Sequence, residues 1–274
     1  MFNQLEFLSD EQSEKLYTIR RYIKNLESVC IAYSGGVDST LVASLAFEQL
    51  GSKAIAITGI SPALANTLRE EAKSQAKWIG VKHLEIKTSE LDHSSYSKNP
   101  KDRCFACKKE LHKHTTFLSK KLNYKIVLDG VNLDDLKDYR PGIQASKQAG
   151  VISPLAKFKF SKQDIRDISR ALGFPWWDKP AQPCLSSRFP YGHEITSERL
   201  KMVEKAEEFL KEGGLSEVRV RCQGSTARIE IPQDELKHFS NKFNLNELVQ
   251  YFSNLGFSCT SLDLEGLISG KLNR

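Results

Sequence analysis

The chain lacks any apolar run near the ~18 residues that a membrane-spanning helix requires, so a helical membrane protein is not expected. Low-complexity segments and internal repeats are also missing, which argues against a disordered or collagen-like protein. The N-terminus is acidic and has neither the basic start nor the apolar centre of a signal peptide. We therefore expect a cytoplasmic protein with no membrane partner. Its 274 residues allow one large domain or two, and its hydrophobic content of 40% is ample for a core.

The chain also lacks a concentrated charge of either sign. Its 40 basic and 34 acidic residues give a net charge of +6, and the lysines are scattered rather than gathered in one block. A slight excess of this kind suits anionic small molecules such as ATP. Because no basic stripe with interleaved aromatic residues is present, we do not expect nucleic acid as the partner.

Two common nucleotide-binding signatures are absent, because neither G-x-x-x-x-G-K-S/T nor G-x-G-x-x-G occurs. A different pattern, S-G-G-V-D-S, occupies residues 34–39, between the apolar run 29–33 and a helix-like run at 40–46. Its two glycines allow a tight turn in which backbone N–H groups converge on an anion. The start of the following helix adds partial positive charge, and Ser34, Ser39 and Thr40 add hydroxyl donors. The pattern predicts a phosphate-binding loop, with an ordinary strand-to-helix turn as the alternative.

Hydrophobic periodicity predicts alternating strands and helices around this loop. The strands are expected at 29–33, 53–58, 83–86 and 126–128, and the helices at 11–27, from the loop to about Leu50, at 62–79 with Pro62 in the first turn and Gly80 at the end, and at 104–121. Such alternation implies an α/β fold with a parallel sheet and helices on both faces. Ligands gather at the carboxyl ends of parallel strands, so the loop and the segment 129–132 should share one cleft.

A helix at 161–172 and an irregular segment rich in Pro, Trp and Gly at 173–193 end this pattern. Beyond it the chain predicts a smaller α+β arrangement: a helix at 195–212, strands at 217–222 and 226–231, helical structure at 233–255 and a last strand at 258–264. We therefore expect a nucleotide-binding domain at 1–190 and a C-terminal α+β domain at 191–274 that serves substrate binding or oligomerisation.

The six cysteines are not expected to form structural disulfides in a reducing compartment. Cys30, Cys222 and Cys259 lie inside apolar or alternating runs, which is typical of small buried hydrophobic residues.

Cys104 and Cys107 lie one helical turn apart, and neighbouring cations favour their thiolate form. Cys184 also lies near a cation. Four interpretations are open. The pair could be half of a zinc site completed by His112 and His114, although these histidines on a lysine-rich helix are expected at the surface. It could be a redox dithiol, or all three could be structural. The three thiolates could also hold three irons of a [4Fe–4S] cluster, leaving the fourth iron open to carry a sulfide.

Several segments together resemble one family. They are S-G-G-V-D-S at 34–39, D-G-V-N-L-D-D at 129–135, D-Y-R-P-G at 138–142, C-L-S-S-R-F-P-Y-G at 184–192, Arg219-Val220-Arg221, and the C-terminal stretches 262–266 and 269–271. The first identifies only the PP-loop ATP pyrophosphatase superfamily, with its adenine nucleotide alpha hydrolase-like fold. The set resembles the LarE family, PP-loop sulfur transferases that make the nickel-pincer nucleotide cofactor of lactate racemase.

The resemblance implies a reaction in which ATP adenylates a carboxylate of a pyridinium-dicarboxylate mononucleotide and sulfur then displaces AMP, giving a thiocarboxylate. In one branch of the family, a cysteine at the position of Cys184 gives up its own sulfur and becomes dehydroalanine. The additional Cys104 and Cys107 resemble the branch whose three cysteines bind a [4Fe–4S] cluster that carries a transferable sulfide. We favour that branch. The family also implies a homo-oligomer, a dimer or a hexamer, and leaves the sulfide donor undefined.

The resemblance and the residue types assign further roles. ATP is expected on Ser34, Gly35, Gly36, Asp38, Ser39, Thr40 and Gly130, and Mg²⁺ on Asp38 and either Asp134 or Asp135, the latter two being solvated turn residues in the alternative. Ser187 and Arg188 are close enough in sequence to Cys184 to contact the substrate. Arg219 and Arg221 share one strand face and suit a substrate phosphate; a solvated face extended by Arg228 is the alternative.

Three other functions remain open at this point. A PP-loop tRNA thiolase also combines such a loop with C-x-x-C and a distant cysteine, but would be expected to carry an RNA-binding module. An ammonia-using amide synthetase would not need the cysteines. A non-enzymatic ATP-binding protein would leave Cys104, Cys107 and Cys184 without a role.

Overall fold

The computed structural model describes residues 2, 4–138, 140–268 and 271. Tyr139, Ser269 and Gly270, which belong to the motifs quoted above, lie outside the described residues. The chain divides into two compact units, one formed by residues 1–90 and 104–182 and the other by 91–103 and 183–274. The expected domains at 1–190 and 191–274 did not include this return of the segment 91–103 to the second unit. No helix in the described part is long and apolar enough to cross a membrane.

The first unit is a four-stranded parallel sheet with the order β3-β2-β1-β4. Its strands are β1 (Val29–Ala32), β2 (Ala54–Ile60), β3 (Lys82–Lys87) and β4 (Ile126–Leu128). Its helices are α1 (Asp10–Lys24), α2 (Val37–Leu50), α3 (Asn66–Ile79), α5 (Arg103–Lys121), α6 (Pro141–Gln148), α7 (Pro154–Lys157) and α8 (Lys162–Ala171). The strand β1 is buried along its whole length, as expected for a continuous apolar run in a central parallel strand.

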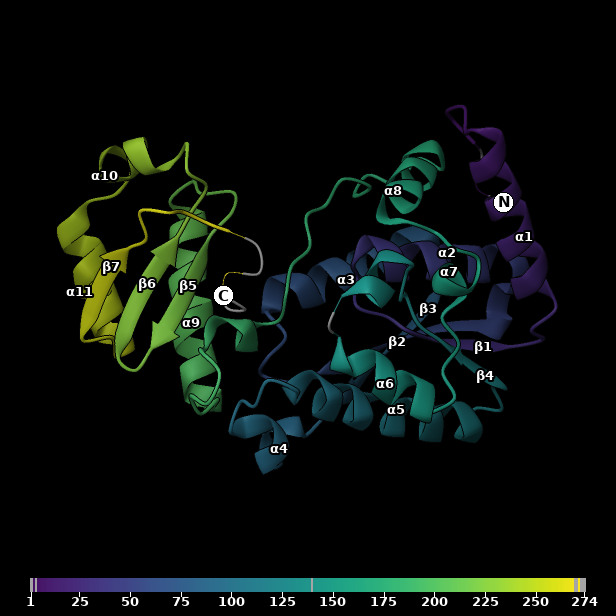
Figure 1. Ribbon diagram of the computed structural model, residues 1–274, viewed down its shortest axis with the longest axis horizontal. Helices are drawn as coiled ribbons and strands as arrows, with labels where there is room; N and C mark the ends of the chain where they lie inside the picture. Colours follow the sequence, from purple (N-terminus) through teal and green to yellow (C-terminus); the bar gives the residue numbers. More distant parts are fainter. Residues whose placement is uncertain (1, 3, 139, 269–270, 272–274) are drawn as a thin grey trace. The chain divides into compact units, whose positions relative to one another are not determined.

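Helices cover both faces of this sheet, which confirms the expected α/β architecture (Figure 1). Alternate β1 residues divide between two cores. Val29 and Ile31 join α1, α2 and α8 in the larger core, whereas Cys30 packs with Val127 and Leu118 in the smaller one on the side of α5. Because the four strands are parallel, their carboxyl ends meet at one edge of the sheet, where the loop 34–39 leads into α2.

The second unit contains a three-stranded mixed sheet with the order β5-β6-β7. The strands are β5 (Arg219–Gln223), β6 (Thr226–Glu230) and β7 (Cys259–Leu262), with β6 antiparallel to β5 and parallel to β7. The helices are α4 (Ser94–Ser97), α9 (Ser197–Glu212), α10 (Phe239–Lys242) and α11 (Leu245–Leu255). A core that includes Val203, Val220 and Phe252 forms where α9 and α11 pack on the sheet.

Two expectations about these elements are wrong. The helix predicted at 62–79 begins only at Asn66, because Pro62 lies in a turn that the Leu64 N–H closes on the carbonyl of Ser61. Cys259 is exposed rather than buried, since it begins β7 at the edge of the small sheet. Cys30 and Cys222 are buried as predicted, and burial raises the pKa of the Cys30 thiol to about 12.

The core of the second unit should depend on Phe252, which is fully buried on α11. We expect Phe252→Ala to lower the free energy of unfolding by roughly 3–5 kcal/mol, because the cavity adds to the lost transfer energy of the ring. Val249 is 51% exposed on the same helix, so Val249→Ala should change it by less than about 0.5 kcal/mol. Urea unfolding measures both, and equal effects would contradict the described packing.

Candidate functional site

The loop after β1 is held in a compact turn by its own serines. The Ser34 N–H donates to Ser39 Oγ at 3.2 Å, and Ser39 Oγ donates to the Gly36 carbonyl at 3.1 Å. Gly35 adopts φ +71°, and an added Cβ would lie 3.0 Å from Cβ of Ala72 on α3. Only glycine meets both conditions easily. The N-terminus of the 14-residue helix α2 is thereby fixed with Ser34 exposed beside it.

The segment after β4 reaches the same loop through Gly130. An added Cβ there would lie 2.7 Å from the Ser39 backbone nitrogen and 2.9 Å from its Cα. The two backbone segments can therefore approach this closely only because residue 130 is glycine and has no side chain. The expected meeting of the two carboxyl-end loops is therefore present in the first unit.

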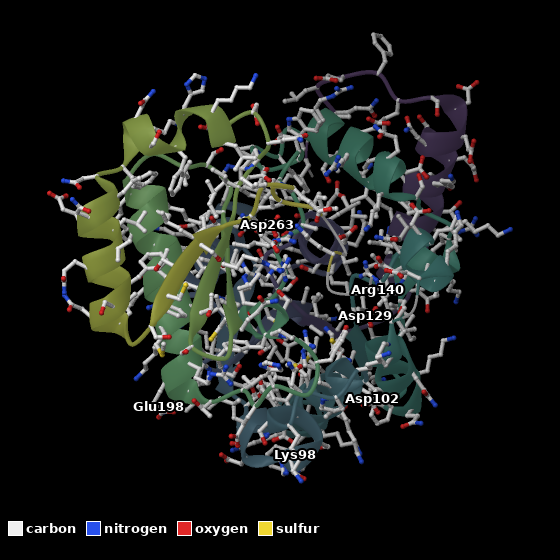
Figure 2. All side chains as sticks on the ribbon, turned by 60° about the vertical axis from the view of Figure 1, so that its left-hand side comes forward. Lys98, Asp102, Asp129, Arg140, Glu198 and Asp263 are labelled. Carbon is white, nitrogen blue, oxygen red and sulfur yellow. The ribbon has the colours of Figure 1, made fainter. Side chains whose placement is uncertain are left out.

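Asn132 links this segment to the loop. Its Nδ2 donates to Asp38 Oδ1 at 3.0 Å, while its backbone N–H and Oδ1 exchange hydrogen bonds with Asp135. Arg140 in turn pairs with Asp135 at 2.9 Å. Burial raises the pKa of Asp38, and the hydrogen bond from Asn132 partly offsets this rise. Figure 2 labels Arg140 and Asp129; the buried Asp129 accepts the Val131 N–H.

The two candidate partners of Asp38 for Mg²⁺ have different surroundings. Asp134 accepts the Lys162 N–H at the start of α8 and pairs with Lys137, and the hydrogen bond from Lys162 is the first cause that lowers its pKa. Asp135 is buried and paired with Arg140. Within the described residues, no three His, Cys, Asp or Glu side chains are grouped as a metal site.

The hydroxyl of Thr40 faces the interior of the first unit. Thr40 is fully buried, and its Oγ1 donates to Gln75 Oε1 at 3.1 Å. The Tyr33 hydroxyl donates to the same oxygen at 3.2 Å, and burial raises the pKa of Tyr33 to about 12. Gln75 therefore ties α3 to the base of the loop.

Cys104 and Cys107 lie in the first turns of α5, the former exposed and the latter half-buried. Gly142 of α6 lies against this stretch, because an added Cβ would be 3.4 Å from the Cys104 carbonyl. His112 is fully buried, so the expectation that it lies at the surface is wrong. Its Nε2 contacts Ser146 Oγ at 2.8 Å, and burial lowers its pKa to about 3, which keeps the ring neutral.

Cys184 lies exposed in the second unit, at the head of the short helix 185–188. Arg188 is only 7% exposed and forms a two-pronged ion pair with Glu207 of α9, at 2.8 and 2.9 Å. Its Nη1 also donates to the carbonyls of Pro183 and Cys184. The guanidinium therefore holds the backbone that carries the thiol.

The arginines of β5 are not a solvated face, so that alternative is wrong. Arg221 is 3% exposed, pairs with Glu230 at 2.8 Å and donates to the Ser187 carbonyl at 2.6 Å. Arg228 pairs with Glu230 and Asp263, the latter labelled in Figure 2. Arg219 is half-buried and has no carboxylate partner among the described residues. Desolvation, Arg188 and Arg221 lower its pKa.

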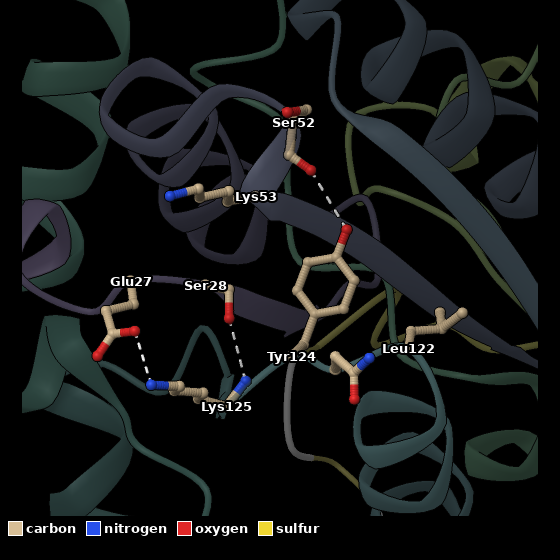
Figure 3. Close-up of a pocket in the computed structure, with 8 residues that line it drawn as sticks. Glu27, Ser28, Ser52, Lys53, Leu122, Tyr124 and Lys125 are labelled. Atoms are coloured by element: carbon tan, nitrogen blue, oxygen red, sulfur yellow. Dashed lines mark hydrogen bonds and ion pairs between the residues drawn. The ribbon is translucent and has the colours of Figure 1, made fainter.

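A hollow at the opposite edge of the parallel sheet is separate from these residues (Figure 3). Ser28, Lys53 and Lys125 line it, and they immediately precede β1, β2 and β4. The amino ends of parallel strands are not where ligands gather, so we do not include the hollow in the site.

The parallel sheet and its S-G-G-V-D-S loop define a PP-loop enzyme that uses ATP with Mg²⁺. A profile of the NAD synthase family matches residues 13–121. The chain is 34% identical to pyridinium-3,5-bisthiocarboxylic acid mononucleotide synthase of Lactiplantibacillus plantarum, over 94% of both chains. It is 53% identical to an uncharacterized protein of Synechocystis over 95% of this chain and 97% of that one, and 34% identical to an uncharacterized protein of Methanocaldococcus jannaschii over 90% and 93%.

This chain belongs to the LarE family. It is an ATP-dependent sulfurtransferase of the PP-loop class.

Three residues of the site were missed by the sequence reasoning. Glu207 and Glu230 hold the buried arginines, and Asn132 holds Asp38. Asn132 lies in a quoted motif, and Glu230 lies on a predicted strand, where it is the direct cross-strand neighbour of Arg219 and pairs diagonally with Arg221. Glu207 gave no signal, because nothing in an acidic helix distinguishes one buried glutamate from its exposed neighbours.

The approach at Gly130 leads to a first prediction for the site. We expect Gly130→Ala to weaken ATP binding about tenfold, since overpacking against the Ser39 backbone must displace the loop. Gly51→Ala is the control: Gly51 follows the far end of α2, has a strained φ of +55° and meets no atom within 4 Å. Calorimetric titration with ATP measures both, and equal losses would contradict a specific role for the close contact.

Asp38 leads to a prediction about pH. Since its pKa is raised in the folded protein, its ionised form is disfavoured by folding, and this destabilisation grows as pH rises from the ordinary value of 3.8 through the raised one. Asp38→Asn should therefore keep or raise the melting temperature at pH 7 while it weakens Mg²⁺–ATP binding about tenfold. Asp134→Asn should lower the melting temperature at pH 7, because the pKa of Asp134 is lowered. Shifts of the same sign would refute these assignments.

Proposed function

We propose that the chain converts a carboxylate of a pyridinium-dicarboxylate mononucleotide to a thiocarboxylate. A carboxylate oxygen attacks the α-phosphorus of ATP, and pyrophosphate leaves with the electrons of the broken P–O bond. A sulfur nucleophile then attacks the carbonyl carbon, and AMP is the leaving group. This substrate is the class that the name of the Lactiplantibacillus plantarum relative implies, and the similarity over 94% of both chains supports its transfer to this protein.

The first unit would carry the adenylation. The backbone of the loop 34–39 and the hydroxyls of Ser34 and Ser39 would bind the pyrophosphate portion of ATP, at the N-terminus of α2. Asp38 would hold Mg²⁺, oriented by the hydrogen bond from Asn132. Burial of a carboxylate here favours a site that is completed by a cation, because the ion compensates the desolvated charge.

The second unit would bind the phosphate of the mononucleotide substrate. Arg219 supports this assignment most directly, because it forms no ion pair with a described carboxylate. Burial lowers its pKa, Arg188 and Arg221 lower it further, and Glu230 and Glu207 offset part of this effect. A phosphate placed there would relieve the repulsion between these cations. Ser187, between Cys184 and Arg188, would supply a further hydroxyl.

The sulfur would come through a [4Fe–4S] cluster bound by Cys104, Cys107 and Cys184. The residue types support this proposal, since thiolates are the usual iron ligands of such clusters. Cys104 and Cys184 are exposed, and Cys107 is half-buried one turn after Cys104 on α5. The cysteines belong to both units, the pair to the first and Cys184 to the second. A bound cluster would supply an iron site that holds the transferable sulfide.

Anaerobic purification with iron and acid-labile sulfide analysis tests the cluster. We expect about four irons per chain, lost in Cys104→Ala, Cys107→Ala and Cys184→Ala together with sulfur transfer. Cys259→Ala is a matched control, because Cys259 is also an exposed cysteine but lies on β7. ATP-dependent pyrophosphate release should persist in all four variants, since adenylation does not use the thiols.

The contrary outcome is equally definite. Absence of iron, with Cys184 converted to dehydroalanine after one turnover, would replace the cluster by the sacrificial mechanism. If the unaltered protein releases no pyrophosphate with any carboxylate substrate of this class, the proposed substrate is wrong. The cytoplasmic location and the dimer or hexamer remain predictions, which fractionation and light scattering check.

A further inference from the structure

The segment 91–103 belongs to the second unit, although the chain before and after it belongs to the first unit. The chain re-enters the first unit at Cys104. Such a detour fixes thirteen residues at an entropic cost and adds no strand to the small sheet, so its contacts must account for it. Several of its polar contacts are made with the segment 186–195, which follows Cys184.

Asn99 is the centre of these contacts. It is fully buried and adopts φ +53°, a conformation that asparagine tolerates better than other residues with a side chain. Its Nδ2 donates to the carbonyls of Phe189 and Pro190, at 3.2 and 2.7 Å, and its own carbonyl accepts the Gly192 N–H at 2.9 Å. Arg103 donates to its Oδ1 at 2.8 Å. Both polar atoms of the Asn99 side chain therefore form hydrogen bonds.

Tyr96 makes the second attachment. Its ring is 2% exposed, and its hydroxyl lies 2.6 Å from Oγ of the fully buried Ser186. Ser186 is two residues after Cys184, within the short helix that Cys184 begins. The contact therefore fixes this helix at a second position, in addition to Arg188, whose guanidinium holds the Pro183 and Cys184 carbonyls.

We propose that Tyr96 and Asn99 are positioning residues for Cys184, which clasp the loop 183–192 so that its exposed thiol is held in a fixed place. The inference rests on the proposed function, in which Cys184 takes part in sulfur transfer. Three sets of contacts then hold the loop: those of Tyr96 and Asn99, those of the Arg188–Glu207 pair and that of Arg221. The clasp acts on the backbone around the thiol and touches no reacting atom.

Two variants test the clasp with little change in shape. Tyr96→Phe removes only the hydroxyl that contacts Ser186. Asn99→Gly keeps the positive φ and the backbone carbonyl that accepts the Gly192 N–H, but removes the hydrogen bonds to the Phe189 and Pro190 carbonyls and the one that Arg103 donates. Asn123→Gly is the matched control, because Asn123 has a similar φ of +60° and lies in the first unit.

The readout separates the two half-reactions. We expect both variants to release pyrophosphate from ATP and substrate at rates within about twofold of the unaltered protein, while thiocarboxylate formation falls about tenfold, as the loss of buried hydrogen bonds implies. A general loss of stability would lower both rates together. Asn123→Gly should change neither. Equal loss of both rates, or no change in thiocarboxylate formation, would overturn the proposal.

A second measurement remains valid even if the proposed function fails. Amide hydrogen exchange in the loop 183–192 should be about tenfold faster in Tyr96→Phe and Asn99→Gly, with exchange in α2 and β1 unchanged. If the loop exchanges at the same rate in Tyr96→Phe and Asn99→Gly as in the control Asn123→Gly, the clasp is refuted whatever the sulfur source. If the loop loosens but no thiocarboxylate is formed by the unaltered protein, the proposed function is refuted and the clasp stands.

Discussion

The approach of the Gly130 backbone to the first turn of α2 is the constraint on which the nucleotide site depends. A parallel sheet brings the carboxyl ends of β1 and β4 to one edge, but a phosphate-binding loop needs more than proximity. Because Gly130 has no side chain, the segment after β4 comes within van der Waals distance of Ser39, and Asn132 can then reach Asp38. The carboxylate is oriented by a residue far away in sequence. Arg140 and Asp135 continue the same chain of contacts to the D-Y-R-P-G motif.

The second unit solves a different problem, which is to hold an exposed cysteine on a segment with almost no regular structure. Buried ion pairs contribute little to stability, because desolvation of both charges offsets their attraction. The pairs Arg188–Glu207 and Arg221–Glu230 are better understood through their remaining N–H groups, which bind backbone carbonyls on both sides of Cys184. Each glutamate fixes an arginine, and each arginine fixes the loop. The main effect of these buried ion pairs is therefore to fix the position of the backbone around Cys184.

Much of this could be predicted from the sequence, for identifiable reasons. Apolar runs and period-two alternation located the seven strands of the described residues, the period of 3.6 located the long helices, and the S-G-G-V-D-S pattern located the loop that begins α2. The burial of individual polar side chains could not be predicted, because distant partners set it. His112 is buried with its Nε2 2.8 Å from Ser146 Oγ on another helix, and Arg221 is buried because Glu230 and the Ser187 carbonyl accept its N–H groups. Local pattern assigns charged and polar residues to the surface, and only a partner elsewhere in the chain reverses that assignment. The detour of 91–103 had no periodic signal at all.

The charge balance of the second unit gives a physical reason to separate Arg219 from its neighbours. Arg188 and Arg221 each have a glutamate within 3 Å, so their charges are compensated before any ligand arrives. Burial is the main cause that lowers the pKa of Arg219, and the nearby Arg188 and Arg221 lower it further. An anion that binds Arg219 would therefore meet a partly desolvated cation without having to break either pair. A carboxylate could satisfy this charge, but a phosphate has more acceptor oxygens and a greater charge, so the arrangement favours phosphate. The glutamates consequently fix the Cys184 loop, and of these three arginines only Arg219 has no ion pair among the described residues, which is why we propose it for the phosphate.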